Sequence, residues 1–355
     1  FFLPLGYARV VNGQTEIHIE RLPAPTSAGE RDLKGSIKIM FQKIIAEPIG
    51  LEYEYPRLAH ATLTDAEIHY LSAPTELRKK VAEAENILLY LHGFTGDTQG
   101  MVQSAFKAGL DKTHLILAFD YESINTPIEE TAWQLRERLE QIGLGAGHGK
   151  TVRLGAHSLG GLVARWFIER EGGDKIVQHL VTLGTPHKGT PWPKIYDWAT
   201  NLLILGLNSL TSVAWPVKLI VSLVKVIETV DHAVDQLGPD TAFIKSLALN
   251  PDPGIPVTAI AGNTSIIPAA SEIQPGENSS RLERLLATLK EMKLLEKAAG
   301  LAFFNQPNDI AVSVNSALGL PHGHKLVTTD IIACDHMSFF DASASLDKLA
   351  EVLSA

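Results

Sequence analysis

A serine flanked by small residues, between an apolar run and an amphipathic run, is the feature that most constrains how this chain folds. The segment reads Gly155-Ala156-His157-Ser158-Leu159-Gly160-Gly161. A serine displayed on so sharp a strand-to-helix turn requires an unusual backbone conformation, and Ala156 and Gly160, two positions away, are small enough to allow it. The first amides of the following helix favour an oxyanion beside the serine. The segment therefore predicts Ser158 as a nucleophile rather than as an incidental serine in a glycine-rich connection.

The region after residue 85 alternates continuous apolar runs with amphipathic stretches. The runs that we expect to be strands are 87–91, 115–119, 152–154, 176–183, 256–260 and 326–334. Helices are expected between them, for example over 128–142 and 160–171. Strands that are apolar throughout are typical of a parallel sheet covered by helices on both faces. We therefore predict an α/β fold with a mostly parallel central sheet.

The N-terminal part has a different pattern. Asn12-Gly13 separates the runs 7–11 and 14–20, and this dipeptide is a strong signal for a two-residue β-hairpin turn. The runs 51–55 and 67–71 are further strand candidates. We expect an antiparallel, strand-rich extension over residues 1–80, followed by a catalytic domain over residues 81–355.

The composition indicates which kinds of binding partner and which cellular location to expect. The chain has 355 residues, of which 45% are hydrophobic, and a formal net charge of -9, which argues against a surface that binds nucleic acid. Its single cysteine, Cys334, allows no intrachain disulfide and favours a cytoplasmic location. The first residue is Phe1 rather than Met, which indicates a processed form or part of a larger multidomain chain.

A nucleophilic serine needs a base to take its proton and an acid to orient that base. His336 directly follows the last apolar run, so we expect it at the carboxyl end of a strand, where open sheets place their ligands. Asp309 lies in a polar turn between the serine and the histidine in sequence, and it is the expected acid. Asp335 is the alternative, but it adjoins His336, and consecutive side chains rarely face each other.

An oxyanion hole is expected from the loop that contains His92-Gly93, because this loop follows an early strand. A glycine loop in that position can turn backbone amides toward the serine, so the Phe94 amide is expected to pair with the Leu159 amide. His92 itself is then expected to make structural hydrogen bonds rather than to act in catalysis.

The order of these motifs resembles that of the α/β-hydrolases of the bacterial lipase and GPI-inositol-deacylase-like type. The resemblance covers roughly residues 86–355 and rests on His92-Gly93, on 156–161, on Thr182-Leu183-Gly184-Thr185-Pro186-His187-Lys188-Gly189-Thr190, on Asn308-Asp309 and on Asp335-His336. It implies the α/β-hydrolase fold, with the nucleophile, acid, base and oxyanion donors at the residues named above. Two positions depart from the family pattern: Ala156 replaces the commoner first glycine of the serine turn, and Ile310 stands where related sequences often have glycine.

Residues 191–250 are expected to form a helical insertion, and apolar residues crowd the part from Leu202 to Ile227. In the lipases that the chain resembles, an insertion here forms a lid over the serine. A lid with apolar inner faces favours a lipid or long-chain acyl ester as substrate and allows peripheral contact with a membrane. The alternative is a buried helical hairpin that completes the core.

The predicted activity is that of a metal-independent serine esterase or lipase without a cofactor. His322 and His324 lie close together in sequence, but no acidic residue or cysteine stands near them at ligand spacing, so a solvated loop is expected instead of a metal site. Amidase, thioesterase or peptidase activity through the same residues remains an alternative within enzymes. A non-catalytic binding module that keeps the fold is the alternative outside them.

Overall fold

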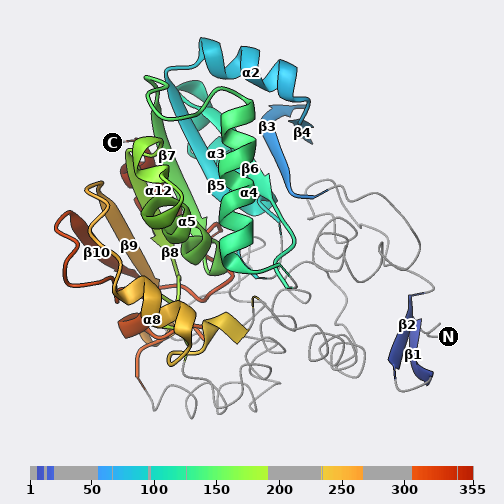
Figure 1. Ribbon diagram of the computed structural model, residues 1–355, viewed down its shortest axis with the longest axis vertical. Coiled ribbons are helices and arrows are strands. Elements are labelled where there is room, and N and C mark those ends of the chain that lie inside the picture. Colours follow the sequence, from blue (N-terminus) through green and yellow to red (C-terminus); the bar gives the residue numbers. More distant parts are fainter. Residues whose placement is uncertain are drawn as a thin grey trace, which may run out of the picture.

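An eight-stranded, mostly parallel sheet forms the centre of the molecule (Figure 1). The computed structural model describes residues 6–11, 14–19, 55–65, 67–94, 97–124, 126–190, 233, 235–266, 306–341 and 343–354. The strand order is β10-β9-β8-β7-β5-β6-β3-β4. The strands are β3 (Arg57–Thr64), β4 (Glu67–Leu71), β5 (Asn86–Leu91), β6 (Leu115–Asp120), β7 (Thr151–His157), β8 (His179–Leu183), β9 (Val257–Gly262) and β10 (Val327–Ile332). Only β3 runs antiparallel to its neighbours, β4 and β6.

Helices cover both faces of this sheet, as the alternating pattern of the sequence predicts. The α-helices are α2 (Pro74–Glu83), α3 (Gln99–Lys107), α4 (Ile128–Gln141), α5 (Leu159–Arg170), α8 (Ala242–Ala248), α11 (Val314–Ala317) and α12 (Ser343–Ser354). Short 3-10 helices are η2 (Leu110–Lys112), η3 (Gly173–Lys175), η4 (Asp235–Leu237) and η5 (Thr264–Ile266). No helix among the described residues is long and apolar enough to cross a membrane.

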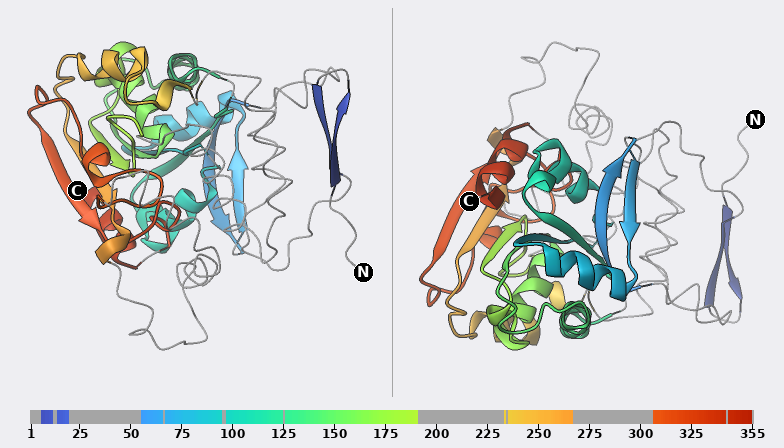
Figure 2. Two further views of the ribbon diagram at one scale, coloured as in Figure 1. Left: turned by 90° about the horizontal axis from the view of Figure 1, so that it is seen from below. Right: turned by 90° about the horizontal axis from the view of Figure 1, so that it is seen from above.

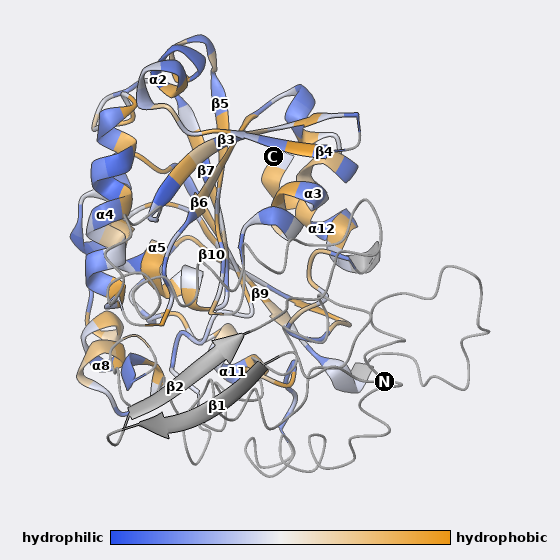
Figure 3. Cartoon of the chain, turned by 90° about the vertical axis from the view of Figure 1, so that its right-hand side faces the viewer, coloured by the Kyte–Doolittle hydropathy of each residue, from blue (hydrophilic) through white to orange (hydrophobic). Residues whose placement is uncertain are grey.

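Strand β5 illustrates how the two faces are filled. Ile87, Leu89 and Leu91 belong to the core cluster under α2, α4 and α5, whereas Leu88 and Tyr90 belong to the cluster under α3 and α12. Successive side chains of a strand point to opposite faces, so a strand that is apolar throughout is buried on both. Figure 3 shows α4 and α5 on one side of the sheet and α3 and α12 on the other. The α/β architecture expected from the sequence, a mostly parallel sheet with helices on both faces, is confirmed.

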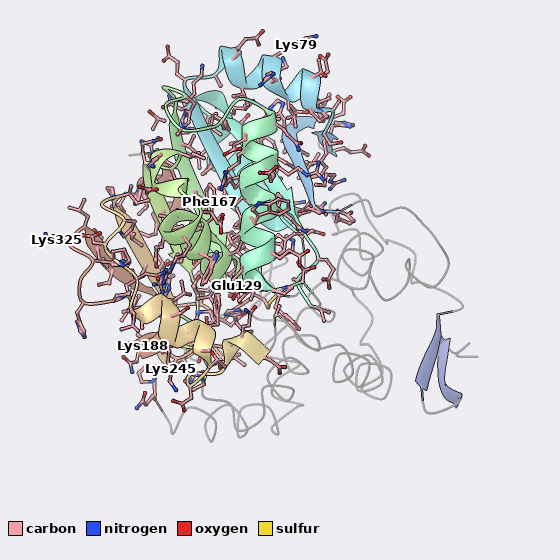
Figure 4. The ribbon with its side chains drawn as sticks, viewed as in Figure 1. Lys79, Glu129, Phe167, Lys188, Lys245 and Lys325 are labelled. Carbon is pink, nitrogen blue, oxygen red and sulfur yellow. The ribbon has the colours of Figure 1, made fainter. Side chains whose placement is uncertain are left out.

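The two edges of the sheet are formed by its first two strands in sequence, β3 and β4, and by its last two, β9 and β10. Figure 2 shows β3 and β4 in blue at one edge and β9 and β10 in orange and red at the other. Charged side chains such as Lys79 and Lys325 project outward in Figure 4, whereas Phe167 on α5 is fully buried. The first strand of the main sheet, β3, begins at Arg57. The sheet therefore includes residues that the sequence pattern assigned to the N-terminal extension of residues 1–80.

A separate antiparallel hairpin precedes the main sheet in sequence. It consists of β1 (Gly6–Val11) and β2 (Gln14–Ile19), and Val11 pairs with Gln14. This register leaves Asn12-Gly13 as the two-residue connection that the sequence predicts.

Most of the expected lid lies outside the described residues, which resume near residue 233. The end of the insertion is described and forms η4 and α8. Phe243 of α8 stacks on Trp166 of α5 with ring centres 5.4 Å apart, and Ile244 and Leu247 are buried. This last part of the insertion therefore packs into the core beside α5.

A buried ion pair fixes the position of α8 against α5. The Arg165 and Glu169 side chains are only 1% and 2% exposed, and their Nε and Oε1 atoms lie 2.7 Å apart. Arg165 also donates to the Leu247 carbonyl at 2.9 Å, and Asn250 Nδ2 donates to Glu169 Oε2 at 2.7 Å. A buried charge that loses its partner is costly, so this pair is sensitive to removal of either charge.

We predict that Glu169→Gln lowers the free energy of unfolding by about 3 to 5 kcal/mol, because it leaves the Arg165 charge buried without a counter-charge. Glu140→Gln is the matched control, since Arg136 and Glu140 form a pair of the same spacing on α4 with side chains 38% and 44% exposed. An exposed pair of this kind contributes about 0.3 to 0.5 kcal/mol. Urea unfolding of both variants provides the measurement, and equal losses would contradict the account.

Candidate active site

Ser158 occupies the turn between β7 and α5, in the conformation that the sequence predicts. Its φ is 53° and its ψ is -124°, a combination that non-glycine residues rarely adopt. Its amide donates to the Leu183 carbonyl at 2.8 Å, which ties the turn to β8. A Cβ on Gly160 would collide with the His92 carbonyl oxygen, so only glycine fits there. The turn is therefore held between the backbone of β8 on one side and the backbone of His92 on the other.

The side chains of Ser158, His336 and Asp309 form a continuous hydrogen-bonded chain. The distance from Ser158 Oγ to His336 Nε2 is 2.9 Å, and that from His336 Nδ1 to Asp309 Oδ2 is 2.7 Å. Each of the three residues is 1% exposed. A carboxylate only accepts, so Nδ1 of His336 donates to Asp309 and Nε2 is left to accept the serine proton.

Asp309 is itself fixed by the turn that it begins. Its Oδ1 accepts from the amides of Ala311 and Val312 at 3.0 and 2.7 Å. The intervening Ile310 has a φ of 83°, which is unfavourable for a β-branched residue and easy for glycine. Glycine would adopt this conformation without strain, and here the turn after Asp309 forms with isoleucine instead.

Asp335, the alternative acid, has a different position. Its Oδ1 accepts from the Met337 amide at 2.8 Å and its Oδ2 from the Ser338 hydroxyl at 2.7 Å. Burial raises the pKa of Asp335. Its hydrogen bonds hold the turn that carries His336, whereas the carboxylate on the imidazole is that of Asp309.

The segment 182–190, which carries part of the family resemblance, places the backbone of a glycine directly against His336 and Asp309. Gly184 has a φ of 55°, and a Cβ there would lie 2.9 Å from Asp309 Oδ2 and 3.0 Å from His336 Nδ1. Gly262, at the end of β9, is equally confined, because a Cβ there would lie 2.8 Å from the Cβ of Asp309. Sequence reasoning did not single out Gly262, since its role arises only from contacts in three dimensions.

His157 is a second residue that sequence reasoning missed. Its Nε2 donates to the main-chain carbonyl of His336 at 2.9 Å, and the two imidazole rings lie 4.8 Å apart. The residue before the serine therefore holds the loop that carries the histidine. Its place in the turn, adjacent to Ser158, is the only signal in the sequence.

The loop expected to supply an oxyanion donor lies against the serine. A Cβ on Gly93 would be 2.7 Å from the Cβ of Ser158. Phe94 follows Gly93 directly, and Leu159 is the first residue of α5. These two residues thus adjoin the closest approach between the loop and the serine turn.

His92 holds this loop in place through structural hydrogen bonds, as expected. Its Nε2 accepts from the Tyr121 amide at 3.0 Å, so its Nδ1 carries the proton and donates to the Gly93 carbonyl at 2.7 Å. The imidazole stacks on the Tyr121 ring with centres 4.2 Å apart. The Tyr121 hydroxyl donates to the His92 carbonyl at 2.6 Å.

Two more histidines are buried beside α5. His187 shares a 3.0 Å hydrogen bond with the Thr182 hydroxyl through Nε2, and burial holds its pKa well below the usual value, an effect that the Arg165 charge strengthens. His324 is buried as well, whereas His322, Gly323 and Lys325 around it are exposed, as expected of a solvated loop. Among the described residues, no cluster of three or more histidine, cysteine or acidic side chains could hold a metal ion.

We predict that His187 makes the folded state less stable as the pH falls below about 6.5. The histidine binds a proton in the unfolded chain at this pH, whereas the buried imidazole of the folded state stays neutral. His187→Gln should flatten the decline of the free energy of unfolding between about pH 6.5 and 5. The exposed His322→Gln is the control and should leave the decline unchanged. Parallel profiles for wild type and His187→Gln would contradict the assignment.

A family described as "Domain of unknown function (DUF7379)" matches residues 56–354. No curated protein matches the chain in sequence.

Solved structures of three bacterial or archaeal proteins are similar to it at low sequence identity. The mature lipase BlEst2 of Bacillus licheniformis is 20% identical over 76% of this chain and 93% of its own, with a TM-score of 0.46. The esterase PF2001 of Pyrococcus furiosus is 10% identical over 87% of this chain and 91% of its own, with a TM-score of 0.47. The RedJ thioesterase of Streptomyces coelicolor is 12% identical over 77% of this chain and 87% of its own, with a TM-score of 0.47.

Proposed function

The chain belongs to the family described as a domain of unknown function, DUF7379, and we propose that it is a serine hydrolase that cleaves carboxylic esters. Ser158 is the nucleophile, His336 the base and Asp309 the acid. The observation that supports this most strongly is the buried chain of hydrogen bonds from Ser158 Oγ through His336 to Asp309, with lengths of 2.9 and 2.7 Å. The serine also stands on a strained strand-to-helix turn, where α/β-hydrolases display their nucleophile.

In the first half-reaction, Ser158 Oγ attacks the acyl carbonyl carbon while its proton moves to His336 Nε2. The imidazolium that forms is stabilised by the Asp309 carboxylate. The backbone amides of Phe94 and Leu159 donate to the oxyanion of the tetrahedral intermediate. The carbon–oxygen bond to the alcohol then breaks, and His336 returns the proton to the leaving oxygen.

In the second half-reaction, water attacks the acyl-serine. His336 Nε2 takes a proton from this water, and the tetrahedral intermediate collapses to release the carboxylic acid and restore the serine hydroxyl. Every proton thus moves through a single nitrogen atom. That is why the hydrogen bond on the other nitrogen, which sets the tautomer, matters for both steps.

The substrate class that we propose is a lipid or long-chain acyl ester. This rests on the apolar residues between Leu202 and Ile227, which lie outside the described residues. Apolar side chains near an acyl site would take up the chain of such a substrate, and each buried methylene would contribute about 0.8 kcal/mol. Contact of this segment with a membrane surface is part of the same proposal.

Replacing Ser158 by alanine is expected to reduce kcat for p-nitrophenyl butyrate by about 10⁶-fold, because the residues of such a triad act as a unit. The melting temperature should stay close to that of the wild type, since the hydroxyl contributes little to packing. Ser265→Ala, at an exposed serine, is the control and should keep full activity. A Ser158→Ala protein that still hydrolyses the ester would contradict the assignment of Ser158 as the nucleophile.

The two buried carboxylates are distinguished by Asp309→Asn and Asp335→Asn. The first should lower kcat by about 10⁴-fold, because the amide would hold the imidazole in the wrong tautomer. The second should have a much smaller effect, since Asp335 accepts from Met337 and Ser338 within its own turn. The same ester assay decides, and the opposite ranking of the two variants would reject Asp309 as the acid.

The proposed substrate class is tested with p-nitrophenyl esters from acetate to dodecanoate. If an apolar site takes up the acyl chain, kcat/KM should rise by about fourfold for each added methylene until the site is filled. A profile that peaks at acetate would argue for a small polar ester and against the lid.

A further inference from the structure

Two loops lie side by side at the carboxyl end of the sheet, because β5 and β6 are adjacent parallel strands (Figure 1). Residues 92–94 follow β5 and include Phe94, whose amide we propose as an oxyanion donor. Residues 121–124 follow β6, and the proposed mechanism gives them no part in the reaction. The second loop is thus placed where it can support the first.

Hydrogen bonds hold the main chain of the first loop at three successive carbonyl groups. The Tyr121 hydroxyl donates to the His92 carbonyl at 2.6 Å, and His92 Nδ1 donates to the Gly93 carbonyl at 2.7 Å. The Ser123 hydroxyl donates to the Phe94 carbonyl at 2.8 Å. Two of the three donors therefore come from the loop after β6.

The last two of these bonds hold the two peptide groups on either side of the Phe94 Cα atom. The Gly93 carbonyl and the Phe94 amide belong to one trans peptide group, so the N–H points away from the carbonyl that His92 holds. The Phe94 carbonyl belongs to the next peptide group, which Ser123 holds. The Phe94 side chain is buried in the main core. The Phe94 backbone therefore has little freedom to change the direction of its N–H.

Ser123 is itself buried, and its loop is held by hydrogen bonds of its own. The side chain of the neighbouring Glu122 accepts from the Ile124 amide and from the Thr126 hydroxyl, each at 2.9 Å. Ile124 is buried in the main core. The Ser123 hydroxyl therefore starts from a fixed position, from which it can define that of the carbonyl it binds.

We propose that Ser123 is a positioning residue for the oxyanion hole. Its hydroxyl holds the Phe94 backbone in the orientation in which the Phe94 amide donates to the oxyanion. This inference rests on the proposed function, because it requires an oxyanion that Phe94 stabilises. Without the hydroxyl, the Phe94 backbone can rotate, and its N–H is no longer aligned before the reaction begins. The loss of an interaction that is made only in the transition state lowers kcat and leaves KM unchanged.

Ser123→Ala tests this role in the full chain, with p-nitrophenyl butyrate as substrate. We expect kcat to fall by about tenfold with KM unchanged, a smaller loss than the roughly 10² to 10³-fold that removal of an oxyanion donor itself costs. Ser104→Ala is the matched control, because Ser104 is also buried and donates to a main-chain carbonyl, that of Met101, at 2.6 Å. The control should keep the kcat and KM of the wild type, even where both variants lower the melting temperature equally.

A hexyl trifluoromethyl ketone provides a second readout that a purely structural role of Ser123 would not change. Ser158 Oγ adds to the ketone carbon, its proton moves to His336, and the ketone oxygen becomes an oxyanion that the hole must stabilise. We expect the inhibition constant to rise by about tenfold in Ser123→Ala, in parallel with the fall in kcat/KM, because the adduct resembles the transition state. It should stay unchanged in Ser104→Ala.

Ser123→Cys is a second variant, which nearly keeps the size of the side chain but has a weaker donor, so its kcat should lie between those of the wild type and Ser123→Ala. It takes the place of Ser123→Ala if that variant folds poorly. The proposal is overturned, with the esterase function intact, if neither variant lowers kcat, if only KM changes or if Ser104→Ala loses as much kcat. A wild type that does not hydrolyse the ester rejects the proposed function and this inference with it.

Discussion

The 2.7 Å hydrogen bond between His336 Nδ1 and Asp309 Oδ2 decides which nitrogen of the histidine faces the serine. Because the carboxylate can only accept, the proton of the neutral imidazole stays on Nδ1, and Nε2 is free to take a proton from Ser158. The rest of the site serves to hold these two groups in register. The Asp309 carboxylate is fixed by two amides of its own turn, and the His336 main chain is fixed by His157.

The parallel sheet explains how residues far apart in sequence meet at this bond. Strands β7, β8 and β9 are neighbours and run in the same direction, so Ser158, Gly184 and Gly262 emerge at one edge. The bare backbone of the two glycines leaves room for the histidine and the acid between the strand ends. Any side chain at these positions would push the imidazole away from its partners. The site therefore requires glycine at positions 184 and 262 as well as the polar groups.

Much of this arrangement could be predicted from local patterns. The serine turn follows from small residues at fixed spacing, and the parallel strands follow from apolar runs of suitable length. Long-range contacts could not be predicted in this way. The sequence predicts residues 57–64 only as part of the N-terminal extension, with 51–55 as the strand candidate there, yet 57–64 form β3 and pair with β6, which lies beyond β5 along the chain. His324 lies in a polar stretch, and its burial depends on how that loop packs. The left-handed conformation of Ile310 is likewise set by the turn around Asp309 and not by its own preference.

We propose that this hydrogen-bonded chain activates Ser158 as a nucleophile. This activation is tested by treating the protein with a p-nitrophenyl phosphonate ester, which traps an activated serine covalently, and by locating the adduct with peptide mass spectrometry. We expect a single phosphonyl group on Ser158, and no adduct once His336 is replaced by alanine. Failure to form an adduct, or an adduct spread over other serines and independent of His336, would contradict it.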